Sequence, residues 1–236
     1  MKLRMQITKE KDIRFISHLE YIRTIERAIR RAKIPAAYSE GFNPHMKFSL
    51  ASALGVGVVS YTEFVEIELA EPMEVEAAAA ALSKALPRGI KVLAADAVDT
   101  HHAALMAQAA GASYRVTVPY AGDVTAAAEA FNAVEQLLFK KSAPKRKEKF
   151  KEIDVKFCIP QIAVQYEDGA VVFTFDCKIT PGGSMKAVDL LNALNEHYGL
   201  QLPVEKADIE RLALYRLDKD GHKQSMLDAG AIQLVK

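Results

Sequence analysis

The chain of 236 residues has little cysteine and no long apolar segment, and each lack excludes a class of protein. Its two cysteines, Cys158 and Cys177, are too few for a disulfide framework or for the usual all-cysteine iron–sulfur cluster. No apolar run approaches the roughly 20 residues that cross a bilayer, and the charged N-terminal stretch lacks the apolar core of a secretory signal. We therefore expect a cytoplasmic protein with reduced thiols and no membrane contact.

Motifs typical of nucleotide, metal and radical chemistry are also missing. The chain has no GxxxxGK[ST] or GxGxxG phosphate loop, and it has no CxxxCxxC motif of a radical SAM enzyme. Its histidines show neither HxxxH nor HExxH spacing. We expect no metal site and no cofactor bound by this chain.

The net charge of +1 conceals two basic segments. Residues 1–33 and residues 140–151 each carry a net charge of +6, so the remainder is acidic. Such segments can guide a polyanion or an acidic protein surface to particular faces, and they can equally be ordinary solvated faces. Charge alone leaves these alternatives open.

Alternation and helical periodicity predict the same six elements in each half of the chain. The first half has strand 2–8, helix 18–33, an extended stretch 36–51 that is broken at Gly41 and Asn43-Pro44, strand 64–69, helix 75–86 and strand 90–98. The second half has strand 112–120, helix 123–139, extended stretches 152–166 and 170–179, helix 186–198 and strand 207–218. The repeated βαββαβ order predicts an α+β protein made of tandem ferredoxin-like domains with antiparallel sheets. The predicted domains are residues 1–100 and 111–220, followed by a C-terminal tail at 221–236.

A two-residue turn sets the register of one predicted hairpin. Asp168-Gly169 is typical of such a turn, and it pairs Val171 with Tyr166 and Phe175 with Ile162. Cys158 and Cys177 then share the inward face, where we expect both to be buried and reduced.

The helix at 18–33 begins with a predicted capping box formed by Ser17 and Glu20. Leu19 and the isoleucines that follow it share one arc, which we expect to pack inward. Arg23, Arg27 and Arg30 share another arc. Like charges at this spacing oppose helix formation slightly, so the stripe suits an anionic ligand, although a solvated face explains it equally well.

His18 stands at the first helical position, and the positive end of the helix disfavours its protonated form. The neutral ring is a packed side chain, a hydrogen-bond donor or a catalytic base. The loop 38–47 combines Phe42, Asn43, His45 and Lys47 around Gly41. Its exposed aromatic and its polar groups suit RNA or a phosphorylated ligand, and a plain structural turn is the alternative.

Several of these motifs carry a resemblance to a known family. RFISHL at 14–19, ERAIRRA at 26–32, YSEGFNPH at 38–45, and Ser60 with Glu63 resemble the bacterial radical SAM-linked proteins, whose biochemical function is uncharacterised. Residues 181–184 (PGGS) match more diffusely, and Met46 and the Ala-rich residues 51–53 depart from the Pro-containing family pattern. Such proteins are encoded beside a radical SAM protein or fused to it. The resemblance implies a radical SAM partner, which would carry the S-adenosylmethionine and the iron–sulfur cluster.

The same stretch is more distantly similar to the ferredoxin-like CRISPR RNA-processing proteins. These are duplicated βαββαβ proteins that hold RNA, and some cut it with a histidine. This chain has only Gly221 and Gly230 after Gly199, so it lacks their glycine-rich loop near the C-terminus. That departure weighs against nuclease activity.

We therefore expect an accessory protein that binds RNA, either tRNA or rRNA, for modification by a radical SAM enzyme. One alternative is a protein–protein adaptor of that enzyme without RNA binding. Another is an enzyme in which His18 and His45 act as acid and base on RNA or on a small phosphorylated substrate. The predicted RNA- or anion-binding residues are Arg14, Arg23, Arg27, Arg30, Phe42, Asn43, Lys47, Lys145, Arg146 and Lys147.

Overall fold

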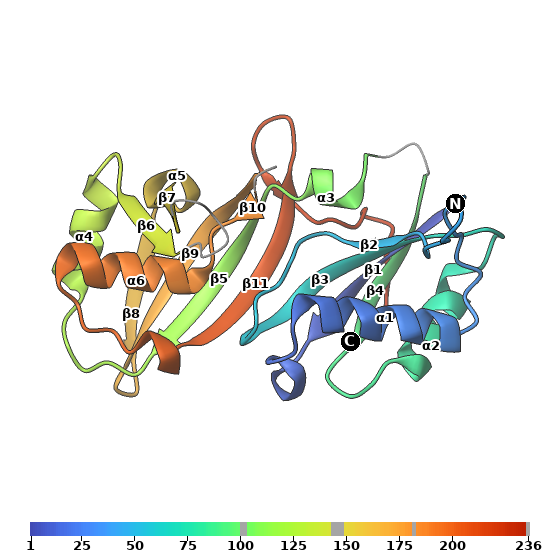
Figure 1. Ribbon diagram of the computed structural model, residues 1–236, viewed down its shortest axis with the longest axis horizontal. Coiled ribbons are helices and arrows are strands. Elements are labelled where there is room, and N and C mark those ends of the chain that lie inside the picture. The colour runs from blue at the N-terminus through green and yellow to red at the C-terminus, as the bar shows by residue number, and fades with distance from the viewer. Residues whose placement is uncertain (100–102, 143–148, 181–182, 235–236) are drawn as a thin grey trace. The chain divides into compact units, whose positions relative to one another are not determined.

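The computed structural model describes residues 1–99, 103–142, 149–180 and 183–234. The chain divides into two compact units (Figure 1). Unit 1 comprises Met1–Ala110 and Leu214–Lys236, and unit 2 comprises Gly111–Ala213. The structure thus groups residues 214–236 with the first unit, whereas the sequence places them at the end of a second domain and in a tail. No helix among the described residues is long and apolar enough to cross a bilayer.

Unit 1 has the predicted βαββαβ order. Its strands are β1 (Lys2–Lys9), β2 (Phe48–Leu50), β3 (Val58–Glu68) and β4 (Val92–Val98), and its longer helices are α1 (His18–Arg31) and α2 (Val75–Ala85). The sheet order is β4-β1-β3-β2 with every pair antiparallel, which is the ferredoxin-like arrangement. The shorter elements of the unit are η1 (Lys11–Ile13), α3 (Leu105–Gln108), β12 (Lys223–Gln224) and β13 (Ile232–Gln233).

Helices α1 and α2 cover one face of this sheet (Figure 1). The alternation of β1 points Leu3, Met5 and Ile7 toward them, and all three side chains are completely buried in one apolar cluster with Ile25 and Leu82. Burying each such side chain stabilises the fold by about 1.5–3 kcal/mol. The opposite face of the sheet is therefore left to the polar residues of the same strands.

Unit 2 repeats the plan with an insertion. Its strands are β5 (Gly111–Val118), β8 (Ile162–Glu167), β9 (Ala170–Thr180) and β11 (Asp208–Leu217). Strand β11 belongs to this unit up to Ala213. The longer helices of the unit are α4 (Thr125–Ala133) and α6 (Ala187–Tyr198). The strand order β8-β9-β5-β11 corresponds to that of unit 1, and the predicted α+β fold class is confirmed. The inserted and shorter elements are β6 (Leu138–Ser142), β7 (Phe150–Asp154), α5 (Val155–Cys158), β10 (Gly183–Ser184) and η2 (Val204–Lys206).

The predicted hairpin register is confirmed residue by residue. Val171 pairs with Tyr166, and Phe175 pairs with Ile162. Cys177 is buried as expected, but Cys158 ends the short helix α5 and is only partly buried. The prediction of one extended stretch over 152–166 was wrong because Asp154 caps this helix by accepting the amides of two following residues.

Two other boundaries differ from the predictions. The helix expected over 123–139 ends at Ala133, because Val134 has an extended backbone and the residues from Leu138 onward form strand β6, which pairs with β7. Of the extended stretch expected over 36–51, only Phe48–Leu50 forms a strand, because Tyr38 bridges to Met46 within the same segment and closes a loop.

Candidate nucleic-acid interface

Helix α1 begins with the predicted capping box. The Ser17 hydroxyl accepts a hydrogen bond from the Glu20 amide at 3.2 Å, and the Glu20 carboxylate accepts one from the Ser17 amide at 2.8 Å. Interactions of the Glu20 carboxyl with the backbone amide and then with the side chain of Ser17 lower the pKa of Glu20, because they stabilise its charged form. The cap fixes where the helix starts and thus which residues face outward.

The outward arc of α1 carries the predicted arginines. Arg23, Arg27 and Arg30 are all exposed. Arg30 pairs with Glu26 at 2.6 Å, whereas neither Arg23 nor Arg27 forms an ion pair within the part of the chain that the structure describes. Two of the three guanidinium groups are therefore available to an external anion.

Leu19 lies on this outward arc, so the prediction that it packs inward was wrong. Its side chain is 54% exposed, while Ile25 is completely buried. At 100° per residue the two lie about 120° apart around the helix, which is too far to share one buried stripe.

The loop 38–47 folds back on itself beside the end of α1. The Ser39 amide donates to the His45 carbonyl at 2.8 Å, and the His45 amide donates to the Ser39 hydroxyl at 2.9 Å. Gly41 has a φ of +116°, which permits the turn at the tip. Phe42 at this tip is fully exposed, and Asn43 beside it is exposed as well.

A contact between Arg30 and Tyr38 connects the arginine stripe to this loop. The Tyr38 phenol lies close enough to the Arg30 guanidinium to interact with it, and this contact, followed by the charge of Glu26, raises the pKa of Arg30. The last turn of α1 therefore lies against the residue that opens the loop carrying Phe42.

A second exposed aromatic precedes the other end of α1. Phe15 is 68% exposed, and the guanidinium carbon of Arg14 lies 4.8 Å from the centroid of its ring. The ring also passes close to the backbone at Gly57, whose amide donates to the Arg14 carbonyl at 2.8 Å.

Lys9, which was not among the predicted site residues, holds this region together. Its side chain is 1% exposed, and its ammonium donates to the carbonyls of Arg14 at 2.9 Å, Ile16 at 3.1 Å and Gly55 at 3.2 Å. The sequence held one sign of this role. Lys9 follows Met5 and Ile7 in the alternation of β1, at a position where an inward-facing apolar residue is expected.

The two predicted catalytic histidines lie near opposite ends of α1. His18 starts the helix, whereas His45 pairs with Ser39 in the loop that contacts Arg30. A helix of 14 residues is about 21 Å long. The structure therefore does not bring the two rings together for joint acid–base chemistry.

Lys47 points away from the arginine stripe. It pairs with Glu68 at 2.9 Å, and both line a cavity of about 230 Å³ together with Lys2 and Glu66. Glu66 and Glu68 alternate with the core residue Ile67 on β3, so this cavity opens on the sheet face opposite α1.

Lys145, Arg146 and Lys147 lie outside the described residues. The strands β6 and β7 that flank them belong to unit 2, where Lys141 pairs with Asp189 of α6 at 2.6 Å.

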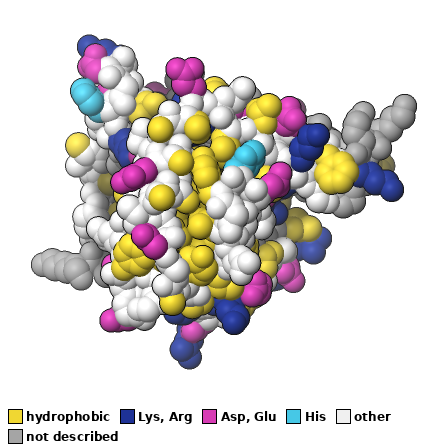
Figure 2. All heavy atoms as spheres, turned by 90° about the vertical axis from the view of Figure 1, so that its left-hand side faces the viewer, with side chains coloured by type: hydrophobic (Ala, Val, Ile, Leu, Met, Phe, Trp, Pro, Cys, Tyr) yellow, Lys and Arg dark blue, Asp and Glu magenta, His cyan; other side chains and the backbone are white. Residues whose placement is uncertain are grey.

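On the face shown in Figure 2, apolar side chains gather at the centre and most Lys and Arg side chains lie toward the edges.

One group of possible metal ligands occurs among the described residues. One donor atom each of Asp218, Asp220 and His222 lies within 4.8 Å of the others. The Asp218 carboxylate, however, accepts the backbone amides of both other residues at 2.9 and 2.8 Å, which lowers its pKa. The cluster is an exposed turn held by its own hydrogen bonds.

These observations define an α+β protein built of ferredoxin-like units, one of which presents an arginine stripe between two exposed phenylalanines. The chain belongs to the family described as an uncharacterized protein conserved in bacteria (DUF2344), whose sequence model matches residues 2–187. A comparison with curated proteins finds no match.

Two solved structures show low similarity. A chain in the crystal structure of a Cbf5-Nop10-Gar1 complex has 14% identity and a TM-score of 0.47, with 95% of this chain and 60% of that chain covered. The present chain thus spans less than two thirds of that relative. An unknown protein from Galdieria sulphuraria has 14% identity and a TM-score of 0.25, with 89% and 96% covered. At these values the similarities carry no argument about function.

Proposed function

We propose that unit 1 binds RNA through the Arg–Phe surface, which we define as Arg23, Arg27, Arg30 and Phe42. The observation that carries the proposal is the contact between Arg30 and Tyr38, because it places the fully exposed Phe42 loop beside the stripe. Arginines suit phosphate because the guanidinium group offers several donors in a planar fork, and an exposed aromatic ring suits an unpaired base.

The exposure of Phe42 supports a ligand rather than a structural role. Burying a phenylalanine contributes about 1.5–3 kcal/mol to folding, and Phe42 contributes none of this in the protein alone. Asn43 at the same tip adds hydrogen-bonding groups for a base edge or a ribose. Arg14 and the predicted Lys145, Arg146 and Lys147 would add phosphate contacts beyond the Arg–Phe surface.

We further propose that the protein acts as the accessory of a radical SAM enzyme. The support is the resemblance of residues 14–68 to radical SAM-linked proteins. The partner would hold the S-adenosylmethionine and the iron–sulfur cluster, and this chain would present the tRNA or rRNA. If the partner is bound but RNA is not, the protein is an adaptor only.

The test compares two triple charge reversals within unit 1. Arg23→Glu, Arg27→Glu and Arg30→Glu together should abolish binding of labelled tRNA or rRNA in fluorescence anisotropy, and Phe42→Ala should weaken it. Lys84→Glu, Arg88→Glu and Lys91→Glu change the net charge equally but leave α1 intact, so that variant should retain most of the affinity. RNA binding by the wild type should also weaken steeply with salt, because phosphate contacts release counterions.

Two results would overturn RNA binding by this surface: no affinity of the wild type at low salt, or equal losses in both triple variants. Crosslinking and sequencing of RNA bound to the native protein identifies the RNA species. Co-purification of the radical SAM protein from nuclease-treated extract tests the partner separately, and we expect the α1 triple variant to retain it. If the partner does not co-purify with the wild type, the accessory role is wrong.

A further inference from the structure

We infer that the RNA held by unit 1 is single-stranded, and that its bases stack on two aromatic side chains, Phe42 and Phe15, near the two ends of α1. This inference rests on the proposed function. It adds Phe15 as a binding residue and specifies the state of the RNA.

Phe15 is exposed although hydrogen bonds hold the backbone around it in place. Three backbone carbonyls of the surrounding loops, including those of Arg14 and Ile16, accept hydrogen bonds from the buried Lys9 ammonium. The Gly57 amide also donates a hydrogen bond to the Arg14 carbonyl, at 2.8 Å. Two loops are thus fastened together, and yet the ring remains 68% exposed.

The Arg14 guanidinium suits this ring to a nucleotide. It lies 4.8 Å from the ring centroid, within the range of a cation–π contact. A base that stacks on the ring would bring its own phosphate into the field of this cation. Aromatic stacking of this kind contributes about 1–3 kcal/mol per base and tolerates different bases.

The spacing of the two aromatics suits a short strand. Phe15 lies two residues before the cap Ser17, and the Phe42 loop contacts Arg30 in the last turn. The helix between them is about 21 Å long, which corresponds to about six nucleotides at the 3.4 Å spacing of a stacked strand. Arg23 and Arg27 occupy the interval, where the phosphates of such a strand would pass.

A duplex cannot use these aromatics, because its bases are already stacked and paired. Proteins that read RNA through aromatic side chains therefore select unpaired segments. A duplex would keep only the phosphate contacts of the arginines, and its affinity should be correspondingly lower.

The experiment uses the full chain and one unstructured 12-nucleotide RNA, alone and annealed to its complement. We expect the single strand to bind at least tenfold more tightly than the duplex. Phe15→Ala and Phe42→Ala should each weaken single-strand binding roughly 5- to 150-fold and leave duplex binding unchanged. Phe42→Tyr should keep the affinity of the wild type because it keeps the ring. Met106→Ala should change nothing, because it removes an exposed apolar side chain from α3, which carries none of the proposed binding residues.

The outcomes separate the inference from the proposed function. Equal affinity for duplex and single strand, or no effect of either alanine variant while the α1 triple variant still loses binding, overturns the inference and leaves RNA binding in place. No binding of either RNA by the wild type overturns the proposed function itself. Circular dichroism of each variant confirms that the comparison is made between folded proteins.

Discussion

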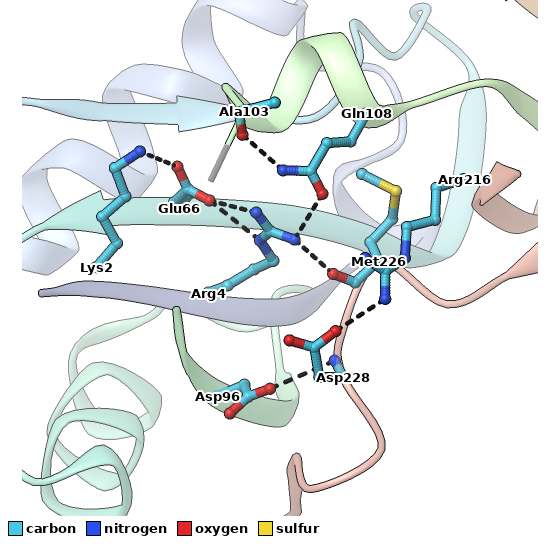
Figure 3. A network of polar contacts seen from close by, with 9 residues as sticks. All are labelled: Lys2, Arg4, Glu66, Asp96, Ala103, Gln108, Arg216, Met226 and Asp228. Atoms are coloured by element: carbon cyan, nitrogen blue, oxygen red, sulfur yellow. Dashed lines mark hydrogen bonds and ion pairs between the residues drawn. The ribbon is translucent and has the colours of Figure 1, made fainter. Parts of the chain in front are cut away.

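Arg4 on β1 and Glu66 on β3 form an ion pair that is almost completely buried, with 2% and 5% exposure (Figure 3). Nη2 and Nε of Arg4 lie 2.6 and 3.1 Å from Oε2 of Glu66. Nη1 of Arg4 donates to the Gln108 side chain at 3.1 Å and to the Met226 carbonyl at 2.7 Å. One guanidinium group therefore ties α3 and the C-terminal segment to the sheet of unit 1.

Removing one charge of this pair should destabilise the protein severely. We expect Glu66→Gln to lower the free energy of unfolding by about 3–5 kcal/mol, because it leaves the Arg4 charge buried without its counterion. Urea denaturation measures this loss. Lys47→Ala breaks the exposed pair with Glu68 and should cost no more than about 1 kcal/mol. Similar losses of unfolding free energy in the two variants would show that burial does not determine how much the pair of Arg4 and Glu66 contributes to stability.

The capping box should contribute measurably to stability. Ser17→Ala removes the acceptor of the Glu20 amide, and we expect it to cost about 1 kcal/mol in thermal or urea unfolding. Ser83→Ala lies on the exposed side of α2 and serves as the control, because alanine is the better helix former there. A loss in the control as large as in Ser17→Ala would contradict the capping role.

The Asp123 carboxyl should titrate far below its usual range. Hydrogen bonds from Thr125 and then from Tyr166 lower its pKa from 3.8 to about 2. Because the folded pKa is the lower one, the contribution to stability is present above about pH 3.8 and is lost as the pH falls toward 2. Carboxyl NMR titration measures the midpoint. Tyr166→Phe should raise it, and a wild-type midpoint near 3.8 would contradict the hydrogen-bonded arrangement.

The two thiols should react slowly and in a fixed order. Burial raises the pKa of Cys177 to about 12 and also raises that of the half-buried Cys158. Because the thiolate is the reactive form, iodoacetamide at neutral pH should modify Cys158 first and Cys177 only after unfolding. Mass spectrometry of Cys158→Ser and Cys177→Ser measures each rate separately. Rapid labelling of Cys177 in the folded protein would contradict its burial.

Features that depend on neighbouring residues were predictable. The capping box of Ser17, the Asp168-Gly169 register and the βαββαβ order of unit 1 are all confirmed. Each is a local rule, set by the reach of one side chain or by the period of a strand or helix. The exposure of the arginine stripe on α1 followed from the same periodicity.

Features that depend on distant partners were missed or misjudged. The predicted helix after Asp123 was too long, because its last residues belong to strand β6, where pairing with β7 overrides helical propensity. The assignment of Leu19 to the core was wrong for a local reason, because Leu19 lies about 120° around α1 from the buried Ile25 and on the arc of the arginines. Lys9 was passed over because one of its acceptors, the Gly55 carbonyl, is 46 residues away, although the Arg14 and Ile16 carbonyls are near it in the sequence.

The sequence by itself determined the βαββαβ order of unit 1, the hairpin at Asp168-Gly169 and the residues that carry charge and aromatic rings, because propensity, period and turn chemistry act over a few residues. The tertiary structure alone decided which of these residues meet. It joined Arg30 to Tyr38, separated His18 from His45 by the length of α1, and turned Lys47 to the opposite face of the sheet. It also bound the segment at Met226 to Arg4, because a buried charge must find its partners wherever the fold places them.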